Sequence, residues 1–259
     1  MASREDQILV FDSGLGGLSV LRELRQLLPR ERFLYYGDSA HAPYGTRPTA
    51  QVRELTLAAL EPFWQQDVKA VVVACNTATA AAIFELRQAH GDRVIIGMEP
   101  ALKPAASRHP KGRILVMATG VTLREQKFCS LMDRFSTQCR IVPLPCPGLV
   151  ELIESGQVRT PAVRARLREL LEPAMQEKVD AVVLGCTHFP FLRPVLQELL
   201  GSNVEILDGA PGAARQTLRR LEQENLLRLS GTGSVELRNS SPDPALLEIS
   251  ARLLEERYS

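Results

Sequence analysis

The sequence predicts an α/β fold of two similar, doubly wound lobes, related by a pseudo-two-fold axis, with a central cleft. Strand-like runs alternate with helical patterns along the 259 residues, which is typical of parallel α/β sheets. Residues 69–77 (KAVVVACNT) and 179–187 (VDAVVLGCT) are both runs of β-forming residues that end in a cysteine followed by small polar side chains. Residues 8–14 (ILVFDSG) and 114–120 (ILVMATG) repeat a second pattern at a similar offset. Two separate landmarks therefore indicate one duplication.

In the first half of the chain, short apolar runs alternate with longer segments of helical periodicity. The run at 8–11 predicts a buried strand, and leucines at positions 21, 24, 27 and 28 predict the helix that follows it. The segment at 37–46 is rich in turn-forming residues, as functional loops are. The predicted elements are strands at 8–11, 33–36, 70–74 and 94–97, and helices at 18–28, 49–66 and 77–89, with Pro62 kinking or ending the second helix.

The second half repeats this alternation and ends in a tail. Its apolar runs again have the length of buried strands, and the segments between them have helical periodicity. One predicted strand begins at residue 114, and another ends at the second cysteine, Cys186. The other three predicted strands span 140–144, 204–207 and 235–238. The predicted helices span about 122–135, 160–177, 191–200 and 213–223, and a final amphipathic helix follows a polar turn at 239–243.

Composition excludes several classes of protein. The 31 basic and 30 acidic residues are interspersed, so the chain has no electrostatic footprint for nucleic acid or an anionic membrane. No apolar run approaches the length of a membrane span, and the first residues are polar, unlike a signal peptide. We therefore expect a cytoplasmic protein, in which the five cysteines are free thiols and not a disulfide framework.

A glycine-rich turn follows the first predicted strand, in the segment Asp12-Ser13-Gly14-Leu15-Gly16-Gly17. Glycines between a strand and a helix expose N–H groups that suit a carboxylate or phosphate, but they also occur where a tight turn needs them for geometry alone. The dinucleotide-binding fingerprint needs a third glycine where this chain has Ser19, so that interpretation is weak. Asp12 favours a functional turn, because an acid at the end of a buried strand is costly without a partner or a task.

The two strand-end cysteines are the main candidates for chemistry. Cys75 and Cys186 each precede a predicted helix N-terminus, which lowers the pKa of a thiol, and each is followed by hydrogen-bonding side chains. Small buried hydrophobes are the expected role of the other cysteines, Cys129, Cys139 and Cys146.

Residues near the second cysteine could assist it. His188 can hold or accept the proton of Cys186, or it can be a structural histidine. A zinc site is disfavoured, because the chain has no CxxC pair, and we expect no metal. Glu151 and Glu154 lie three residues apart on a predicted helix, and the pattern alone does not choose between them. The remaining histidines, His41, His90 and His109, are expected to be structural.

Taken together, these segments resemble the cofactor-independent glutamate racemases of the aspartate/glutamate racemase superfamily. The resemblance runs nearly end to end, and the combination of motifs, in order and at family spacing, is specific. The matching motifs are Asp12-Ser13-Gly14 with Gly16-Gly17-Leu18, Pro43-Tyr44-Gly45, Cys75-Asn76-Thr77-Ala78, and Leu184-Gly185-Cys186-Thr187-His188-Phe189-Pro190.

The resemblance implies a role for each matching residue. Cys75 and Cys186 would be the two bases on opposite faces of the substrate Cα, one removing a proton as thiolate while the other donates one as thiol. Asp12 would assist Cys75, and Glu154 and His188 would assist Cys186. The implied substrate-binding residues are Asp12, Ser13, Pro43, Tyr44, Gly45, Asn76, Thr77, Thr119, Thr122, Thr187 and His188.

The resemblance also implies a domain plan and a biological setting. Residues 1–98 with 209–259 would form the first lobe, and residues 99–208 the second. The protein would be a homodimer that supplies D-glutamate for peptidoglycan. Its small-molecule substrate would be glutamate, it would bind no nucleic acid or membrane, and it would need no cofactor. The five lysines, Lys69, Lys103, Lys111, Lys127 and Lys178, are not placed at strand-end motifs to form a Schiff base with pyridoxal phosphate.

Some positions depart from the family pattern. Glu125 and Phe128 stand where a serine and a tyrosine are usual, which puts the hydrogen bonds around the site in doubt but not the two bases. Asp208-Gly209-Ala210 replaces the frequent Asp-Ser-Gly. Few residues precede the first strand, so we expect no regulation of the kind found in members with a longer N-terminal extension. Three alternatives remain: a racemase of aspartate or another acidic amino acid, a pyridoxal-dependent racemase, and a two-lobed amino-acid-binding protein without catalysis.

Overall fold

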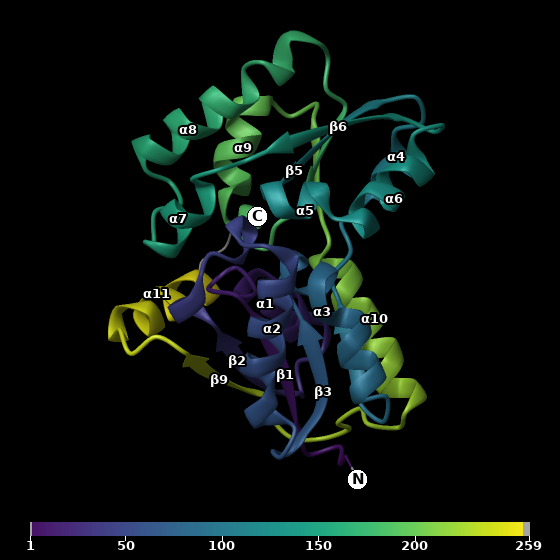
Figure 1. Ribbon diagram of the computed structural model, residues 1–259, viewed down its shortest axis with the longest axis vertical. Helices are drawn as coiled ribbons and strands as arrows, with labels where there is room; N and C mark the ends of the chain where they lie inside the picture. The colour runs from purple at the N-terminus through teal and green to yellow at the C-terminus, as the bar shows by residue number, and fades with distance from the viewer. Residues whose placement is uncertain (1, 256–259) are drawn as a thin grey trace.

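The computed structural model describes residues 2–255 and consists of two α/β lobes, each built on a parallel sheet (Figure 1). The first sheet has the order β4-β3-β1-β2-β9, with β1 (Gln7–Asp12), β2 (Arg32–Gly37), β3 (Val68–Val73), β4 (Val94–Gly97) and β9 (Ser234–Asn239). The second has the order β6-β5-β7-β8, with β5 (Arg113–Ala118), β6 (Arg140–Pro145), β7 (Ala181–Leu184) and β8 (Glu205–Asp208).

The strand order shows the duplication directly. In the first sheet β1 lies between β2 and β3, and β4 lies beyond β3; in the second sheet β5 lies between β6 and β7, and β8 lies beyond β7. All of these pairs are parallel. The prediction of two similar α/β lobes is therefore confirmed. Since ligands bind beyond the carboxyl ends of parallel strands, each lobe offers one such edge to a shared site.

Helices cover both sheets. The first lobe carries α1 (Leu18–Leu27), α2 (Thr49–Leu60) and α3 (Asn76–Ala89), with short 3-10 helices η1 (Ser39–His41), η2 (Tyr44–Thr46) and η3 (Glu61–Phe63). The second carries α4 (Leu102–Arg108), α5 (Gly120–Arg124), α6 (Gln126–Phe135), α7 (Leu149–Glu154), α8 (Pro161–Leu171) and α9 (Arg193–Leu200), with η4 (Ala174–Gln176) and η5 (Phe189–Leu192).

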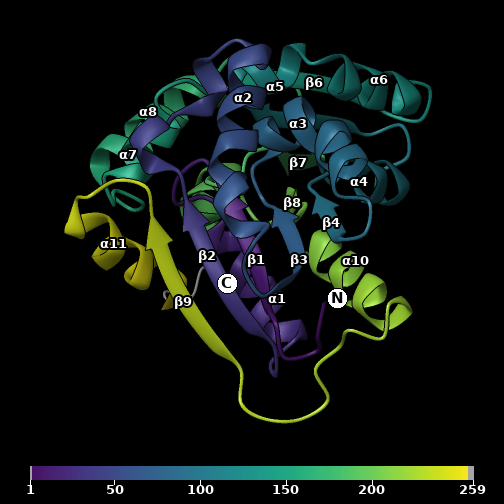
Figure 2. The same cartoon turned by 60° about the horizontal axis from the view of Figure 1, so that its bottom comes forward.

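The chain returns to the first sheet after β8. Helices α10 (Ala210–Gln223) and α11 (Pro244–Glu255) both contact α1, and β9 pairs with β2 at the edge of the sheet (Figure 2). This arrangement agrees with a first lobe completed by the C-terminal segment. The limits 1–98, 99–208 and 209–259 stay a prediction, and residues 1 and 256–259 lie outside the described residues.

Successive side chains of each strand point to opposite faces of the sheet, and both faces are apolar, so the strands are continuous apolar runs in the sequence. Ile8 and Val10 belong to one hydrophobic cluster, and Leu9 and Phe11 to another on the opposite face of the sheet. The first of these clusters continues into the second lobe, where it includes Leu115. Both faces of the sheets are therefore buried, as parallel sheets require. Within residues 2–255, no helix combines the length and apolar character needed to cross a membrane.

Several predicted helices differ in their limits. The helix predicted at 122–135 is two helices, because Glu125 adopts an extended conformation (φ −66°, ψ 132°) between α5 and α6. The helix predicted at 160–177 ends at Leu171, two residues before Pro173. The seven-residue helix α4 was not predicted, since it offers too few turns for a clear period. The strand predicted to end at the second cysteine, β7, ends two residues earlier, at Leu184.

Candidate active site

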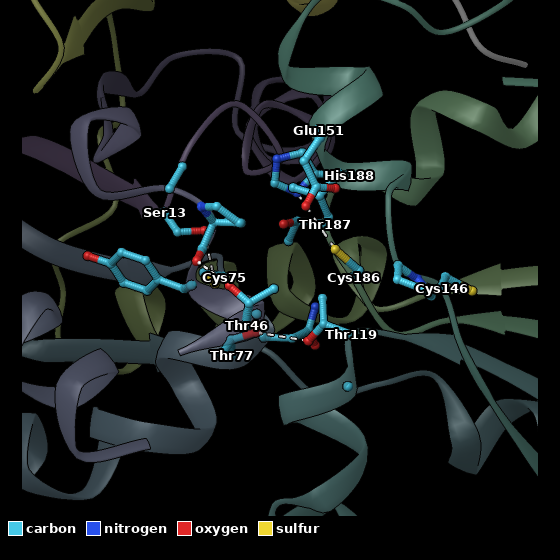
Figure 3. A pocket seen from close by; sticks show the side chains of 18 of the residues that line it. Ser13, Thr46, Cys75, Thr77, Thr119, Cys146, Glu151, Cys186, Thr187 and His188 are labelled. Atoms are coloured by element: carbon cyan, nitrogen blue, oxygen red, sulfur yellow. Dashed lines mark hydrogen bonds between the residues drawn. The ribbon is translucent and has the colours of Figure 1, made fainter. Parts of the chain in front are cut away.

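One cavity of about 410 Å³ brings most of the predicted site residues together. Cys75 and Ser13 lie on one side of it, and Cys186, Thr187 and His188 lie on the other (Figure 3). The predicted residues that line it are Ser13, Pro43, Tyr44, Gly45, Cys75, Asn76, Thr77, Thr119, Glu154, Cys186, Thr187 and His188. The remaining two, Asp12 and Thr122, are buried and contact lining residues from behind.

Cys75 is held at the N-terminus of α3. As the N-cap, its Sγ accepts a hydrogen bond from the Ala78 N–H at 3.4 Å, and it lies 3.5 Å from Ser13 Oγ. Burial, followed by the charge of Asp12, raises the pKa of the Cys75 thiol to about 12. The prediction of a lowered pKa is therefore wrong for Cys75: the helix N–H favours the thiolate, but removal from water opposes it more strongly.

Cys186 has an ionisable partner instead. His188 Nδ1 lies 3.6 Å from Cys186 Sγ, and His188 Nε2 lies 2.5 Å from Glu154 Oε1. Burial lowers the pKa of His188, but its hydrogen bonds to Cys186 and Glu154, with the charges of both, raise the pKa well above its ordinary value of 6.5. These contacts favour the protonated form of His188, and in that form its ring favours negative charge on the Cys186 sulfur.

The two candidate glutamates are distinguished by the geometry. Glu154 makes the hydrogen bond to His188, whereas the side chain of Glu151 is exposed at the cavity. In this arrangement Cys186 supplies the sulfur, His188 is the base beside it, and Glu154 orients that base.

Asp12 lies between the two halves of the site. It is fully buried, it accepts the Gly14 N–H at 3.0 Å, and its other oxygen accepts the Thr187 hydroxyl at 3.0 Å. Burial raises the pKa of Asp12, and the nearby charge of His188 opposes this effect. The group in contact with the Cys75 sulfur is Ser13, so Asp12 acts on Cys75 through its charge.

The glycine-rich turn binds a carboxylate of the protein itself. The Leu15 N–H donates to Glu154 Oε1 at 2.6 Å. A Cβ at Gly14 would lie 2.1 Å from Glu154 Oε1, and a Cβ at Gly16 would lie 2.4 Å from His188 Nδ1. Both interpretations of the turn thus hold: it exposes an N–H to an anion, and it needs glycine so that the second lobe can approach.

Substitution of Gly14 by alanine is expected to damage the site while leaving the fold intact. The new methyl group displaces the flexible end of Glu154, so His188 loses its orienting partner and proton transfer slows by about 10- to 100-fold. Thermal unfolding and α-proton exchange on amino acids measure the two effects. Gly212→Ala is the matched control, because a Cβ there meets nothing within 4 Å. Equal activities of the two variants would refute the stated role of the turn.

Threonines from both lobes meet at the cavity wall. Thr77 Oγ1 lies 3.1 Å from Thr122 Oγ1 and 3.5 Å from Thr119 Oγ1, and the latter two are 3.0 Å apart. A Cβ at Gly45 would lie 2.6 Å from Thr119 Cγ2. The loop of the first lobe and helix α5 of the second are therefore in close contact beside the cysteines.

Some residues around the site were not predicted in this role. Buried Asp38 accepts the hydroxyl of Tyr44, which was predicted, at 2.6 Å; burial, then Asp38, raises the pKa of Tyr44, so the phenol stays neutral. Cys146, predicted as a core thiol, is buried but lines the cavity. Ser19 donates across the lobes to the Thr187 carbonyl. Partners this far apart in the chain leave no signal in local patterns.

The unusual positions have structural partners. Glu125 accepts a hydrogen bond from Thr49 of the first lobe, and Phe128 is buried in the core of the second. Asp208 accepts the Ala210 N–H at 2.9 Å at the start of α10. A Cβ at Gly209 would lie 2.4 Å from the Glu99 carbonyl oxygen, where the chain first leaves the first lobe.

The two cysteines are expected to differ in reactivity with pH. They are similarly accessible, 5% and 8% exposed for Cys75 and Cys186. With a pKa of about 12, Cys75 should react with iodoacetamide about tenfold faster for each pH unit between 7 and 10. Cys186, beside His188, should react faster than Cys75 near pH 7, and the difference should narrow as rising pH ionises Cys75. Peptide mass spectrometry measures both rates, and equal rates at pH 7 would contradict the assigned asymmetry.

The described residues contain no group of three or more His, Cys, Asp or Glu side chains that could hold a metal ion. The cavity presents the thiol sulfurs of Cys75 and Cys186, together with hydroxyl and N–H groups that can bind carboxylates.

Comparisons with known proteins identify the family of the chain. A family model described as Asp/Glu/Hydantoin racemase matches residues 8–217. A glutamate racemase of Clostridium perfringens is 47% identical over 246 residues, covering 95% of each chain. A glutamate racemase isoform of Bacillus anthracis has a TM-score of 0.86 at 29% identity, covering 98% of this chain and 96% of its own. The Escherichia coli glutamate racemase, solved with L-glutamate and an activator, has a TM-score of 0.85 at 32% identity, with 96% and 95% covered. The chain therefore belongs to the Asp/Glu/hydantoin racemase family.

Proposed function

We propose that this protein interconverts L-glutamate and D-glutamate by cofactor-independent proton transfer at Cα, with Cys75 and Cys186 as the two bases. The observation that carries the proposal is that one cavity is lined by both sulfurs, each from the strand-end motif of a different lobe. The names of the relatives support glutamate as the substrate. Two matched bases suit a reaction whose substrate and product are mirror images.

The protonation states of the site define the starting point of the reaction. Cys75 rests as a thiol, because its pKa is raised to about 12. The imidazolium of His188 favours a thiolate at Cys186. The Cys186 thiolate takes the α-proton that faces it and becomes a thiol, while the Cys75 thiol gives its proton to the opposite face of Cα. The net result is inversion with both sulfurs exchanged in protonation; once the product has left, proton exchange with water returns Cys75 to the thiol and Cys186 to the thiolate.

The carbanionic charge that develops at Cα must be stabilised by fixed donors. Asn76 and Thr77 form the first turn of α3, where free N–H groups and the positive end of the helix favour a carboxylate. Thr187 stands on the opposite wall of the cavity. We propose that these residues, with Ser13, Pro43, Tyr44, Gly45, Thr119, Thr122, Asp12 and His188, form and support the substrate-binding surface.

Buried Lys69 supports a mechanism without pyridoxal phosphate. This lysine is fully buried away from the cavity, where its Nζ donates to the carbonyls of Arg4 and Leu226 and pairs with Glu31. It lies in β3 near the amino end, while Cys75 follows the carboxyl end of the same strand. It is therefore not placed to form a Schiff base with a molecule in the cavity.

The wider setting is a proposal that the family resemblance supports. We propose a first lobe of residues 1–98 with 209–259 and a second of 99–208, with the cavity between them. We further propose a cytoplasmic homodimer that supplies D-glutamate for peptidoglycan. Size-exclusion chromatography with light scattering tests the dimer.

The decisive experiment is α-proton exchange in deuterated water without added cofactor. L-Glutamate, D-glutamate and both aspartate enantiomers are incubated separately, and deuterium at Cα and optical rotation are followed. We expect exchange and racemisation with both glutamate enantiomers. Exchange of aspartate alone would establish an aspartate racemase, binding without exchange would establish a catalytically silent binding protein, and a visible absorbance band with pyridoxal-dependent activity would establish a cofactor enzyme.

A further inference from the structure

We propose that Ser19 is a positioning residue for the Cys186 base, which it holds in place from the opposite lobe. The proposal rests on the function proposed above. Ser19 is the second residue of α1 and is buried, 6% exposed. Its hydroxyl lies 2.9 Å from the Gly16 carbonyl and 2.8 Å from the Thr187 carbonyl. Since Thr187 is the residue between Cys186 and His188, this contact fixes the peptide that joins the base to its partner.

Two further hydrogen bonds join the first lobe to the surroundings of Cys186, one at Thr187 and one at Glu154. Asp12 accepts the Thr187 hydroxyl, and the Leu15 N–H donates to Glu154, which holds His188. With the bond from Ser19, the first lobe thus makes three contacts around the Cys186 base. They are to the Thr187 carbonyl, to the Thr187 hydroxyl and to Glu154, the acid that orients His188. Each of these contacts joins the lobe that carries Cys75 to the lobe that carries Cys186.

The support of Cys75 has a different origin. Its two hydrogen-bonding partners, Ser13 and the Ala78 N–H, belong to the same lobe as Cys75 itself. Separation of the lobes would therefore leave the hydrogen bonds of Cys75 intact and remove those that the first lobe makes to Thr187 and Glu154. Cys186, His188 and Glu154 contact one another within the second lobe, and the first lobe adds the contacts that hold Thr187 and Glu154 in place. Ser19 makes one of these contacts and can be changed without touching either sulfur or their acidic partners.

A helix-stabilising role is the alternative explanation for a buried serine. Ser250 illustrates it: it is 1% exposed and donates only within α11, to the Leu246 carbonyl at 2.6 Å. Ser19 also reaches a carbonyl near its own helix, that of Gly16, but its shorter contact crosses to Thr187. Ser250→Ala is therefore the matched control for the loss of a buried serine hydroxyl.

The test compares Ser19→Ala, Ser19→Thr and Ser250→Ala with the wild type. Iodoacetamide labelling of Cys75 and Cys186 is measured in one sample across pH 6–10, so Cys75 is an internal standard. We expect Ser19→Ala to change the ratio of the two rates at neutral pH by about fivefold to tenfold and to alter the pH profile of Cys186 alone. Ser19→Thr, which keeps the hydroxyl, should restore the ratio in part, and Ser250→Ala should leave it unchanged.

Steady-state kinetics provide the second readout. We expect kcat/KM of Ser19→Ala to fall by about fivefold to tenfold for both glutamate enantiomers, since equal free energies of the enantiomers force equal kcat/KM in the two directions. A labelling ratio equal to that of the wild type, or an equal change at both cysteines, would overturn the role of Ser19. Absence of α-proton exchange in the wild type would instead overturn the proposed function, while the labelling ratio would still report on Ser19.

Discussion

Replacement of either Cys75 or Cys186 by serine is expected to reduce glutamate racemisation by about 10³-fold or more. An alcohol is a far weaker acid than a thiol, so serine neither ionises at neutral pH to remove the α-proton nor matches the proton-donating strength of the thiol. Both sulfurs act in each turnover, one as base and one as acid. Loss of either one should therefore affect both directions equally, as measured from each enantiomer by polarimetry.

The cavity itself supplies the control for this prediction. Cys146 lines the same cavity and is buried, and burial, then the charge of Cys186, raises its pKa to about 12. Its Sγ donates to the Leu144 carbonyl at 3.2 Å, a bond that a serine hydroxyl can also make. We expect Cys146→Ser to retain activity within about threefold of the wild type. If Cys146→Ser is as inactive as the other two variants, or if both of those remain fully active, the assignment of the bases is wrong.

Residual exchange distinguishes the two bases further. Cys75→Ser keeps the Cys186 sulfur beside the His188 imidazolium. In deuterated water this variant should therefore still exchange the α-proton of the one enantiomer whose α-proton faces Cys186. Cys186→Ser keeps only the Cys75 thiol, whose pKa is about 12. Its residual exchange of the other enantiomer should therefore be slower at neutral pH than the residual exchange of Cys75→Ser. The structure thus predicts an unequal pair of variants, although the lobes share one strand order.

Local sequence patterns were sufficient to place the two strand-end cysteines of the cavity. Each cysteine ends a continuous apolar run, and such runs form the central strands of both sheets. Because parallel strands place their carboxyl ends at one edge, the position of Cys75 and Cys186 followed from strand identity alone. The break at Glu125 could not be predicted in the same way, since neither glycine nor proline marks it.

Contacts between lobes account for what the sequence did not predict. The acceptor of the Leu15 N–H, Glu154, is 139 residues away in the chain, and the Ser19 hydroxyl reaches a carbonyl 168 residues away. The direction of the pKa shift of Cys75 was also wrong, because the depth of burial depends on the packed lobes and not on the adjacent helix N-terminus. Electrostatic balance at a shared cavity is a tertiary property, and local periodicity carries no information about it.

The largest effect on stability is expected at a buried ion pair far from the cavity. Lys69 and Glu31 are 0% and 1% exposed, with Lys69 Nζ 2.6 Å from Glu31 Oε2. The same ammonium donates to the carbonyls of Arg4 at 2.6 Å and Leu226 at 2.9 Å, and Glu31 accepts the Arg228 N–H at 2.8 Å. One charge pair therefore ties the N-terminal segment, β3 and the chain between α10 and β9 together.

Substitution of Lys69 by methionine should lower the free energy of unfolding by about 3–5 kcal/mol, measured by urea denaturation. Methionine fills the space of the lysine stem but leaves the Glu31 carboxylate buried without a counter-charge. Lys178→Met is the matched control: its ammonium pairs with Asp180 at 2.8 Å but is 87% exposed, so we expect a loss below about 1 kcal/mol.

A double substitution separates the cost of the unpaired charge from the loss of packing. Replacing Glu31 by leucine in the Lys69→Met background removes the uncompensated carboxylate, so part of the lost stability should return. The recovery should be incomplete, because the Arg228 N–H loses its acceptor. At low temperature the folded fraction of Lys69→Met should keep normal kcat/KM, since Cys75 follows the other end of β3. A Lys69→Met protein within 1 kcal/mol of the wild type would show that the ion pair is not what holds the three segments together.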